Sequence, residues 1–136
     1  MSNVDVIENK EKVKLMQPLV LAMIGDSVQT LFVRTHIALA YGVKVNKMNK
    51  WVSSVVSAGA QFKTFKKIEE TLTEEEQDIA RRARNSHIHT KAKNFSFLEY
   101  IHATALEALI GYLHLTNQKE RLDEILKISL EELKTE

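Results

Sequence analysis

The stretch that most constrains this chain is residues 19–28, where an apolar run leads into a single carboxylate. Residues 19–24 are all apolar, Gly25 follows, and Asp26 comes next. Burying an aspartate in an apolar helix is costly unless a hydrogen bond, a cation or a metal ion receives it. Gly25 lowers helix propensity by about 1 kcal/mol relative to alanine. We therefore expect another backbone to pass close to this glycine.

A second carboxylate, Glu107, has similar surroundings. It lies within residues 103–112, where alanine, leucine and isoleucine predominate and a glycine follows four residues after the glutamate. We predict that the two apolar helices cross and that Asp26 and Glu107 meet in one metal site. The spacing leaves a second interpretation open, in which the aspartate is held by neighbouring backbone or by an arginine such as Arg34.

Length and composition favour one all-α domain. The chain has 136 residues with one proline and four glycines, which is long enough to bury a substantial core. We predict a bundle of five to seven helices, with the apolar first helix at its centre. A loose N-terminal arm is expected at residues 1–15, before a single domain at 16–136. The expected helices cover residues 18–40, 47–70, 73–84, 96–115 and 118–133.

Local signals refine three of these helices. Asn46 is a good N-cap for the second helix. Residues 57–60, with the sequence SAGA, are expected either to bend this helix or to let another helix pack closely. Thr73 and the glutamate three residues later match a capping box, so the acidic triple at 74–76 is interpreted as a helix start and not as a metal site. Trp51 and Phe65 are interpreted as core residues in preference to platforms for base stacking.

The net charge of +1 hides a segregation of charge along the chain. Residues 27–68 and residues 79–98 contain lysines and arginines but no aspartate or glutamate. Such blocks favour a polyanionic partner, although a solvated helix face would account for either block alone.

Several classes of protein are disfavoured by the composition. The chain has no cysteine, which excludes a disulfide framework and a thiolate metal site and is typical of a reducing compartment. The N-terminus is polar and acidic, and the apolar runs are shorter than a membrane span. We therefore expect a cytoplasmic protein without a membrane partner. His87 and His89 stand two residues apart in a polar stretch, which does not suit a helical pair of metal ligands, and we assign them no catalytic role.

Two motifs together resemble the catalytic domain of the ribonuclease III family. IGDSV at 24–28 and ALEALIG at 105–111 are similar to its two acidic motifs. The short bacterial branch, Mini-ribonuclease III, is resembled in particular, because five further segments follow its order. These segments are VSA at 56–58, TEEE at 73–76, RxRN at 82–85, TxxKN at 90–94 and ERL at 120–122. The resemblance covers about residues 16–130.

This resemblance implies an all-helical, homodimeric endoribonuclease that cleaves double-stranded RNA by magnesium-dependent phosphodiester hydrolysis. Mn²⁺ is expected as a substitute metal, and the products carry 5′-phosphate and 3′-hydroxyl ends. Asp26 and Glu107 fall on the family's catalytic, metal-binding acids. Larger members have further acids where this chain has Leu19, Ala22 and Thr104, and the short branch is similar to this chain in lacking them.

Larger members also append a double-stranded-RNA-binding domain, and we expect none here. The catalytic domain must then hold RNA itself, and A-form RNA is recognised mainly through its shape, phosphates and 2′-hydroxyls. We expect the basic segment between the two acidic motifs to make these contacts, with Arg84 and Lys93 as the leading candidates. The full set is Arg81, Arg82, Arg84, Asn85, Lys91, Lys93 and Asn94. By resemblance, the substrate is expected to be precursor ribosomal RNA, and no DNA partner is expected.

Two other interpretations compete with a nuclease. A catalytically idle relative would bind structured RNA, for example on a ribosome, but retention of both acids in apolar helices argues against it. A helical protein-interaction module would expose a large apolar stripe and would not need the acid-free basic blocks.

Overall fold

The computed structural model describes residues 10–86 and 95–136, and all the regular secondary structure in these ranges is helical. The predicted all-α class is therefore confirmed for the described part of the chain. Two short 3₁₀ turns, Glu69–Thr71 and Leu130–Glu132, directly follow the helices that end at Ile68 and Ser129. The main helices are α2 (Pro18–Tyr41), α3 (Val45–Val56), α4 (Ala58–Ile68), α5 (Glu74–Asn85), α6 (Phe95–Leu115) and α7 (Lys119–Ser129).

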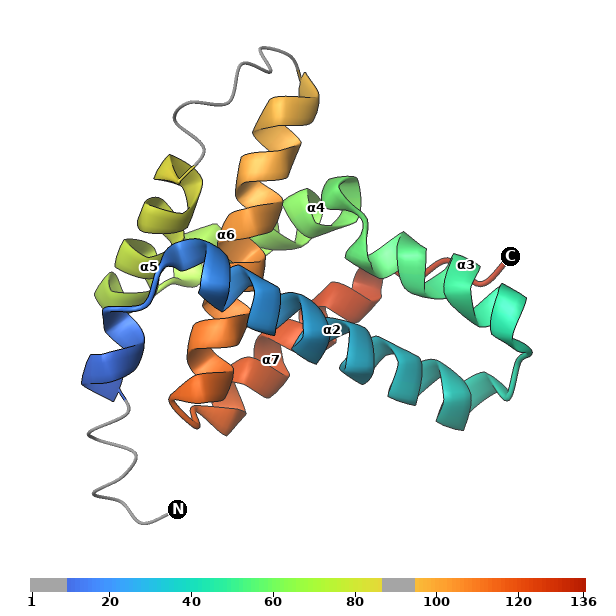
Figure 1. Ribbon diagram of the computed structural model, residues 1–136. Helices are drawn as coiled ribbons and strands as arrows, with labels where there is room; N and C mark the ends of the chain where they lie inside the picture. The colour runs from blue at the N-terminus through green and yellow to red at the C-terminus, as the bar shows by residue number, and fades with distance from the viewer. Residues whose placement is uncertain (1–9, 87–94) are drawn as a thin grey trace.

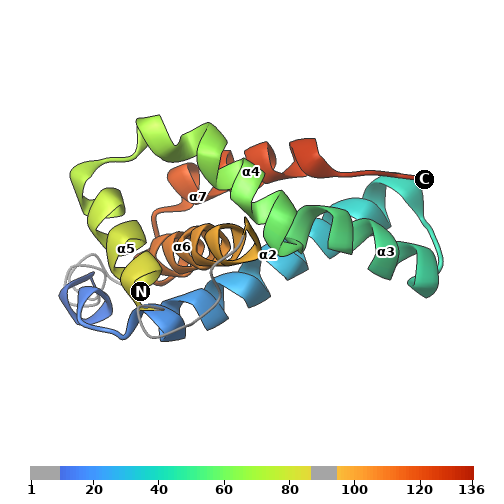
Figure 2. The ribbon, with the colours of Figure 1, turned by 90° about the horizontal axis from the view of Figure 1, so that it is seen from above.

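Helix α6 lies at the centre of the bundle, with α2, α4, α5 and α7 packed around it. Figure 1 shows α2 crossing in front of α6, and Figure 2 shows α6 between α2 on one side and α4 and α7 on the other. The prediction that the first helix is central is wrong. Its sequence is apolar on most faces, yet only one row of α2 residues is buried, and large apolar side chains such as Met23, Leu31 and Leu39 are exposed.

Local residues account for both ends of α2. Pro18 occupies the first turn, where its missing N–H removes no hydrogen bond. Gly42 ends the helix with φ of 60°, a left-handed conformation that glycine adopts without steric cost. The helix therefore spans the whole predicted range and one further residue, Tyr41.

The single helix expected at 47–70 is two helices. Ser57 adopts an extended conformation between α3 and α4, and its side-chain oxygen accepts a hydrogen bond from the Ala60 N–H. This serine therefore ends one helix and caps the next, which explains why the expected bend is a break. The predicted N-cap Asn46 is also wrong, since α3 begins at Val45 and Lys44 occupies the capping position.

Helix α5 begins with the predicted capping box. The Thr73 hydroxyl accepts a hydrogen bond from the Glu76 N–H, and the Glu76 carboxylate accepts one from the Thr73 N–H, both at 3.1 Å. Glu76 is itself buried, and Arg121 of α7 donates to both of its carboxylate oxygens at 3.0 Å. The acidic triple therefore starts a helix, as predicted, and one of its members also anchors α7.

The described part of the expected N-terminal arm is not loose. Residues 10–14 form a helical turn, and Val13 is 3% exposed within the main core. Arg82 of α5 donates to the carbonyl oxygens of Lys14 and Met16, at 2.7 Å and 3.2 Å. This segment therefore packs with the bundle, and residues 1–9 lie outside the described residues.

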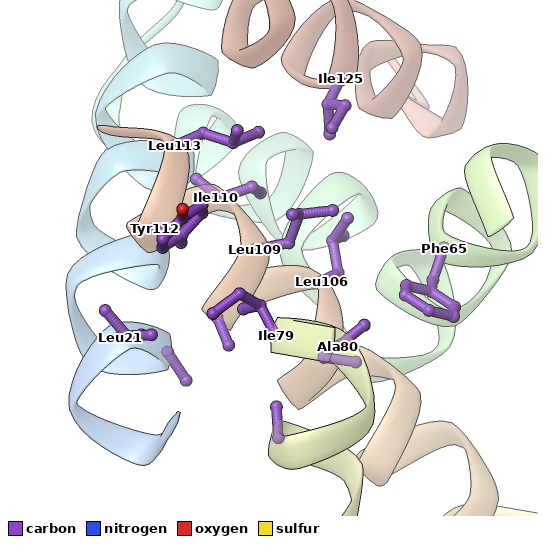
Figure 3. Close-up of a cluster of buried hydrophobic side chains, with 14 of the residues drawn as sticks. Leu21, Phe65, Ile79, Ala80, Leu106, Leu109, Ile110, Tyr112, Leu113 and Ile125 are labelled. Carbon is purple, nitrogen blue, oxygen red and sulfur yellow. The ribbon is translucent and has the colours of Figure 1, made fainter. Parts of the chain in front are cut away.

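The core has two parts. The main part surrounds α6, where Leu106, Leu109 and Tyr112 are fully buried against side chains from α2, α4, α5 and α7 (Figure 3). A smaller part packs the C-terminal half of α2 against α3 and includes Trp51. Trp51 is 6% exposed and Phe65 is fully buried, which confirms both as core residues.

The C-terminal end of the chain closes the bundle. Asn117, with φ of 57°, lies in the turn between α6 and α7, in the gap between the helices expected at 96–115 and 118–133. No helix in the described ranges has the length and apolar character needed to cross a membrane.

Candidate active site

The two acidic motifs meet where α2 crosses α6, and two glycines make the crossing close. A Cβ atom at Gly25 would lie 1.7 Å from the carbonyl oxygen of Glu107, and one at Gly111 would lie 2.0 Å from the carbonyl oxygen of Leu21. Both obstacles are backbone atoms, which cannot rotate away. The expected close approach at Gly25 is therefore confirmed, and the second acidic motif supplies the facing backbone.

This crossing brings the side chains of Asp26 and Glu107 together. The two carboxyl groups are close enough to interact, because the Asp26 carboxylate helps to raise the pKa of the Glu107 carboxyl, and their joint role as metal ligands stays a prediction. Their burial differs from the expectation, because Asp26 is exposed and Glu107 is half-buried. The reason is helical geometry: Gly25 lies on the buried row of α2, and the next residue is turned by about 100° towards solvent.

The surroundings of Glu107 disfavour its charge. Burial raises the pKa of the Glu107 carboxyl to about 7, and the neighbouring Asp26 carboxylate adds to the rise, while a hydrogen bond from Gln61 opposes it. The alternative partner Arg34 is exposed, and within the described ranges no ion pair joins it to Asp26. Among the described residues, the two carboxyl groups thus lie next to each other without an ion-paired basic side chain.

This donor set fits a hard divalent cation. Carboxylate oxygens are the ligands that Mg²⁺ prefers, and a cation would remove the repulsion between the two acids. No group of three or more histidine, aspartate or glutamate side chains capable of holding a metal occurs among the described residues. An ion here would therefore take its other ligands from water or substrate, as Mg²⁺ commonly does.

A polar groove opens beside Asp26. It has a volume of about 600 Å³ and lies between α2 and α3. Its lining includes Thr30 and Arg34 from α2 and Asn49 and Ser53 from α3. These groups offer hydrogen-bond donors and one positive charge next to the acidic pair.

Two of the predicted RNA-binding residues on α5 already have partners within the fold. Arg81 is exposed and pairs with Asp78 one turn earlier. Arg82 is half-buried, and its guanidinium donates to two backbone carbonyl oxygens near the N-terminus. Arg82 therefore has a clear structural role, and the prediction that it contacts phosphate stays a prediction.

The other predicted RNA-binding residues lie at or beyond the end of α5. Arg84 is half-buried, with its guanidinium carbon 5.7 Å from the centre of the Phe65 ring, and Asn85 is exposed at the last position of the helix. Lys91, Lys93 and Asn94 lie outside the described residues, as do His87 and His89.

Sequence reasoning missed two buried glutamines beside the acidic pair. Gln29 and Gln61 are 0% and 2% exposed, and the Nε2 of Gln61 donates to the Oε1 of Gln29 at 2.8 Å. A signal for them exists in the sequence. Gln29 follows Gly25 by four residues and Gln61 precedes Phe65 by four, so each shares a helical row with a buried residue.

Comparison with known protein families assigns the chain to one of them. The ribonuclease III domain matches residues 19–118, which include both carboxylates and most of the described helices. The chain belongs to the ribonuclease III family, and the class that this defines is a ribonuclease III-type endoribonuclease.

Individual relatives narrow the class to short members of the family. The chain is 43% identical to the Mini-ribonuclease 3 of Thermoanaerobacter sp. over 90% of this chain and 86% of that relative. It is 44% identical to the Mini-ribonuclease 3 of Clostridium tetani over 88% of this chain and 80% of that relative. A crystal structure of a Fusobacterium nucleatum protein, 35% identical, superposes with a TM-score of 0.76 and covers 86% of this chain and 93% of that one.

Proposed function

We propose that this protein cleaves double-stranded RNA by magnesium-dependent hydrolysis of phosphodiester bonds, leaving 5′-phosphate and 3′-hydroxyl ends. The observation that carries the proposal is the meeting of Asp26 and Glu107 at the glycine-lined crossing of α2 and α6. Membership of the ribonuclease III family supports the reaction class, and the names of the relatives support a short form of the enzyme.

Each carboxylate has a distinct place in the proposed site. Asp26 is exposed and reachable by a phosphate of the substrate, while Glu107 is half-buried behind it. Together they would hold Mg²⁺, or Mn²⁺ in its place, and such an ion supplies a more acidic water and positive charge for the developing phosphate transition state. The polar groove at Arg34 and Asn49 offers hydrogen bonds and charge to the adjoining RNA backbone.

The surface of α2 supports a homodimer. Every fourth position of α2 from Leu19 to Leu39 is exposed, and apolar side chains occupy four of these six positions, with Met23 at 73% and Leu31 at 68% exposure. Contiguous exposed apolar surface is typical of protein interfaces. A two-fold interface along this row would bring two copies of the Asp26 site to one assembly, each acting on one strand of a duplex.

We further propose that the basic end of α5 and the segment after it contact the RNA. Arg84 and Asn85 lie at the C-terminal end of α5, and Arg81 is exposed one turn earlier. Arg82, Lys91, Lys93 and Asn94 complete the proposed set. Precursor ribosomal RNA in the cytoplasm is the proposed natural substrate.

The test is cleavage of a long RNA duplex in Mg²⁺ by the wild type and by Asp26→Asn. We expect cleavage by the wild type only, with salt-sensitive duplex binding retained in the variant. Products should be ligatable through their 5′-phosphates. Equal cleavage by both proteins would place the chemistry elsewhere, and binding without cleavage by the wild type would indicate an idle RNA-binding protein.

The dimer has its own test. Light scattering of the wild type should give twice the mass of one chain, and Met23→Glu should shift the protein towards the monomer. A monomeric wild type would contradict the proposed interface along α2.

A further inference from the structure

Three helices contribute to one buried polar chain behind the acidic pair. Gln29 lies on α2, Gln61 on α4 and Glu107 on α6. Gln61 stands between the other two, because its amide hydrogen-bonds both to Gln29 and to the Glu107 carboxylate. Asp26 then contacts the same carboxylate from the solvent side.

The two glutamines are unusual occupants of their positions. Both are more than nine-tenths buried, and the Nε2 of Gln29 has no hydrogen-bond partner among the described residues. A buried amide without a full set of partners costs free energy that an apolar side chain would not. Packing therefore does not account for this pair, and a role at the neighbouring carboxylate does.

The geometry fixes how the Gln61 amide is turned. Its Nε2 carries two hydrogens, of which one goes to the Gln29 Oε1 at 2.8 Å and the other is available for Glu107. Turning the amide over would point its oxygen at both the carboxylate and the Gln29 oxygen, and these contacts are repulsive. The negative charge of the Glu107 carboxylate thus selects the orientation in which Gln61 donates to it, and Gln29 accepts the other hydrogen of the same amide.

We propose that Gln61, held by Gln29, is a positioning residue that orients the Glu107 carboxylate towards Asp26 for binding a divalent cation. This inference rests on the proposed function, because it takes the two acids as the metal ligands. Groups that hydrogen-bond to metal ligands fix their orientation, and losing one commonly weakens metal binding or activity by about 10- to 100-fold.

The experiment compares Gln61→Met with the wild type. Methionine preserves the length and flexibility of the side chain but cannot donate a hydrogen bond. The dissociation constant of Mn²⁺ is measured without RNA, by the electron paramagnetic resonance of the free ion. The second constant is the Mn²⁺ concentration for half-maximal cleavage, measured at saturating duplex. We expect both constants to weaken by about 10- to 100-fold in Gln61→Met. A smaller loss is expected in Gln29→Met, where Gln61 is present but unsupported.

Thr64→Val provides the matched control. Thr64 lies three residues after Gln61 on α4, is fully buried, and its hydroxyl has no hydrogen-bond partner among the described residues. Valine alters the core on the same helix and leaves Gln61 in place, so we expect unchanged metal constants in this variant. A loss here would assign the effect seen in Gln61→Met to disturbed core packing. Thermal melting of all variants separates loss of folding from loss of metal binding.

The outcomes separate this inference from the proposed nuclease. If Gln61→Met folds and its two Mn²⁺ constants equal those of the wild type, the positioning role is overturned, whatever the cleavage rate. A second outcome is that the wild type cleaves no duplex, but its Mn²⁺ binding depends on Asp26 and weakens in Gln61→Met. This outcome would support the positioning role and refute the proposed function. Absence of Asp26-dependent Mn²⁺ binding in the wild type would overturn the role itself. If Gln61→Met does not fold, Gln29→Met decides by the same two constants.

Discussion

Two glutamates, Glu76 and Glu107, are held in opposite ways by the same small bundle. Glu76 is 3% exposed and receives three hydrogen bonds from Arg121 and one from the Thr73 N–H. Glu107 is half-buried and faces another carboxylate, with the neutral amide of Gln61 as a donor. The first is a neutralised structural anchor between α5 and α7.

The difference distinguishes a glutamate that stabilises the fold, Glu76, from a glutamate with a functional role, Glu107. A buried carboxylate with a bidentate arginine satisfies its own hydrogen-bonding requirement. A carboxylate next to a second acid destabilises the fold unless a cation arrives, and such sites are typically functional. The molecule can supply an arginine to a glutamate, as it does at Glu76, and it does not do so at Glu107.

The largest expected effect concerns cleavage. Glu107→Gln should lower the rate of duplex cleavage about 10³-fold or more, because losing a metal ligand removes several kcal/mol of transition-state stabilisation. Glu76→Gln should leave the rate per folded molecule close to that of the wild type. Single-turnover cleavage, normalised to the folded fraction, measures both, and a comparable loss in the two variants would remove the distinction between the two acids.

The next effect concerns folding at the Glu76 anchor. Glu76→Gln should lower the free energy of unfolding by about 3–5 kcal/mol, because it leaves the largely buried Arg121 charge without its main partner. Glu124→Gln is the matched control, since Glu124 pairs with the same arginine but is exposed, and its removal should cost at most about 1 kcal/mol. Urea unfolding measures both changes, and equal losses would show that the burial of Glu76 is immaterial.

The crossing that brings Glu107 to Asp26 can be broken directly. Gly25→Ala should destabilise the protein by about 3 kcal/mol or prevent folding, because the new Cβ meets backbone at 1.7 Å. Gly59→Ala is a milder control, since its Cβ would meet only the end of the Glu99 side chain at 2.8 Å. Thermal melting of the two variants compares them, and a wild-type melting temperature in Gly25→Ala would contradict the close crossing.

A smaller effect is expected in the pH dependence of stability. The pKa of Glu107 is raised from 4.5 to about 7, so its protonated form favours the fold, and this stability is lost as the pH rises through 7. Without divalent cations, Glu107→Gln should therefore match the wild type near pH 4.5 and exceed its stability by at most about 3 kcal/mol at pH 8. Urea unfolding at the two pH values tests this, and a constant difference would contradict the raised pKa.

The sequence predicted the helices better than their arrangement. Pro18, Gly42 and the Thr73 capping box act locally, so the ends that they mark could be read from neighbouring residues. The central position of α6 could not, because α2 is equally apolar and only tertiary packing decides which apolar faces are covered. The break at Ser57 was expected only as a bend, since its extended conformation depends on how α3 and α4 pack.

The candidate site was predicted in part for a similar reason. Gly25 and its apolar neighbours indicated a close helix crossing, and the two acidic motifs indicated which helices cross. Asp26 is exposed because of the way α2 is rotated about its own axis against the core. A helix that is apolar on most faces does not show this rotation in its sequence. The role of Gln61 depends on a contact between residues 46 positions apart in the chain, and an isolated glutamine gives no sign of it.

The central claim is that Asp26 and Glu107 form a pair that requires a cation, and Mg²⁺-dependent stability tests it most directly. The free energy of unfolding should be measured at pH 8 for the wild type and Glu107→Gln, each with and without Mg²⁺. The account predicts that the variant is the more stable protein without Mg²⁺, and that added Mg²⁺ stabilises only the wild type and narrows the difference. A variant less stable than the wild type without Mg²⁺, or equal stabilisation of both proteins by Mg²⁺, would contradict it.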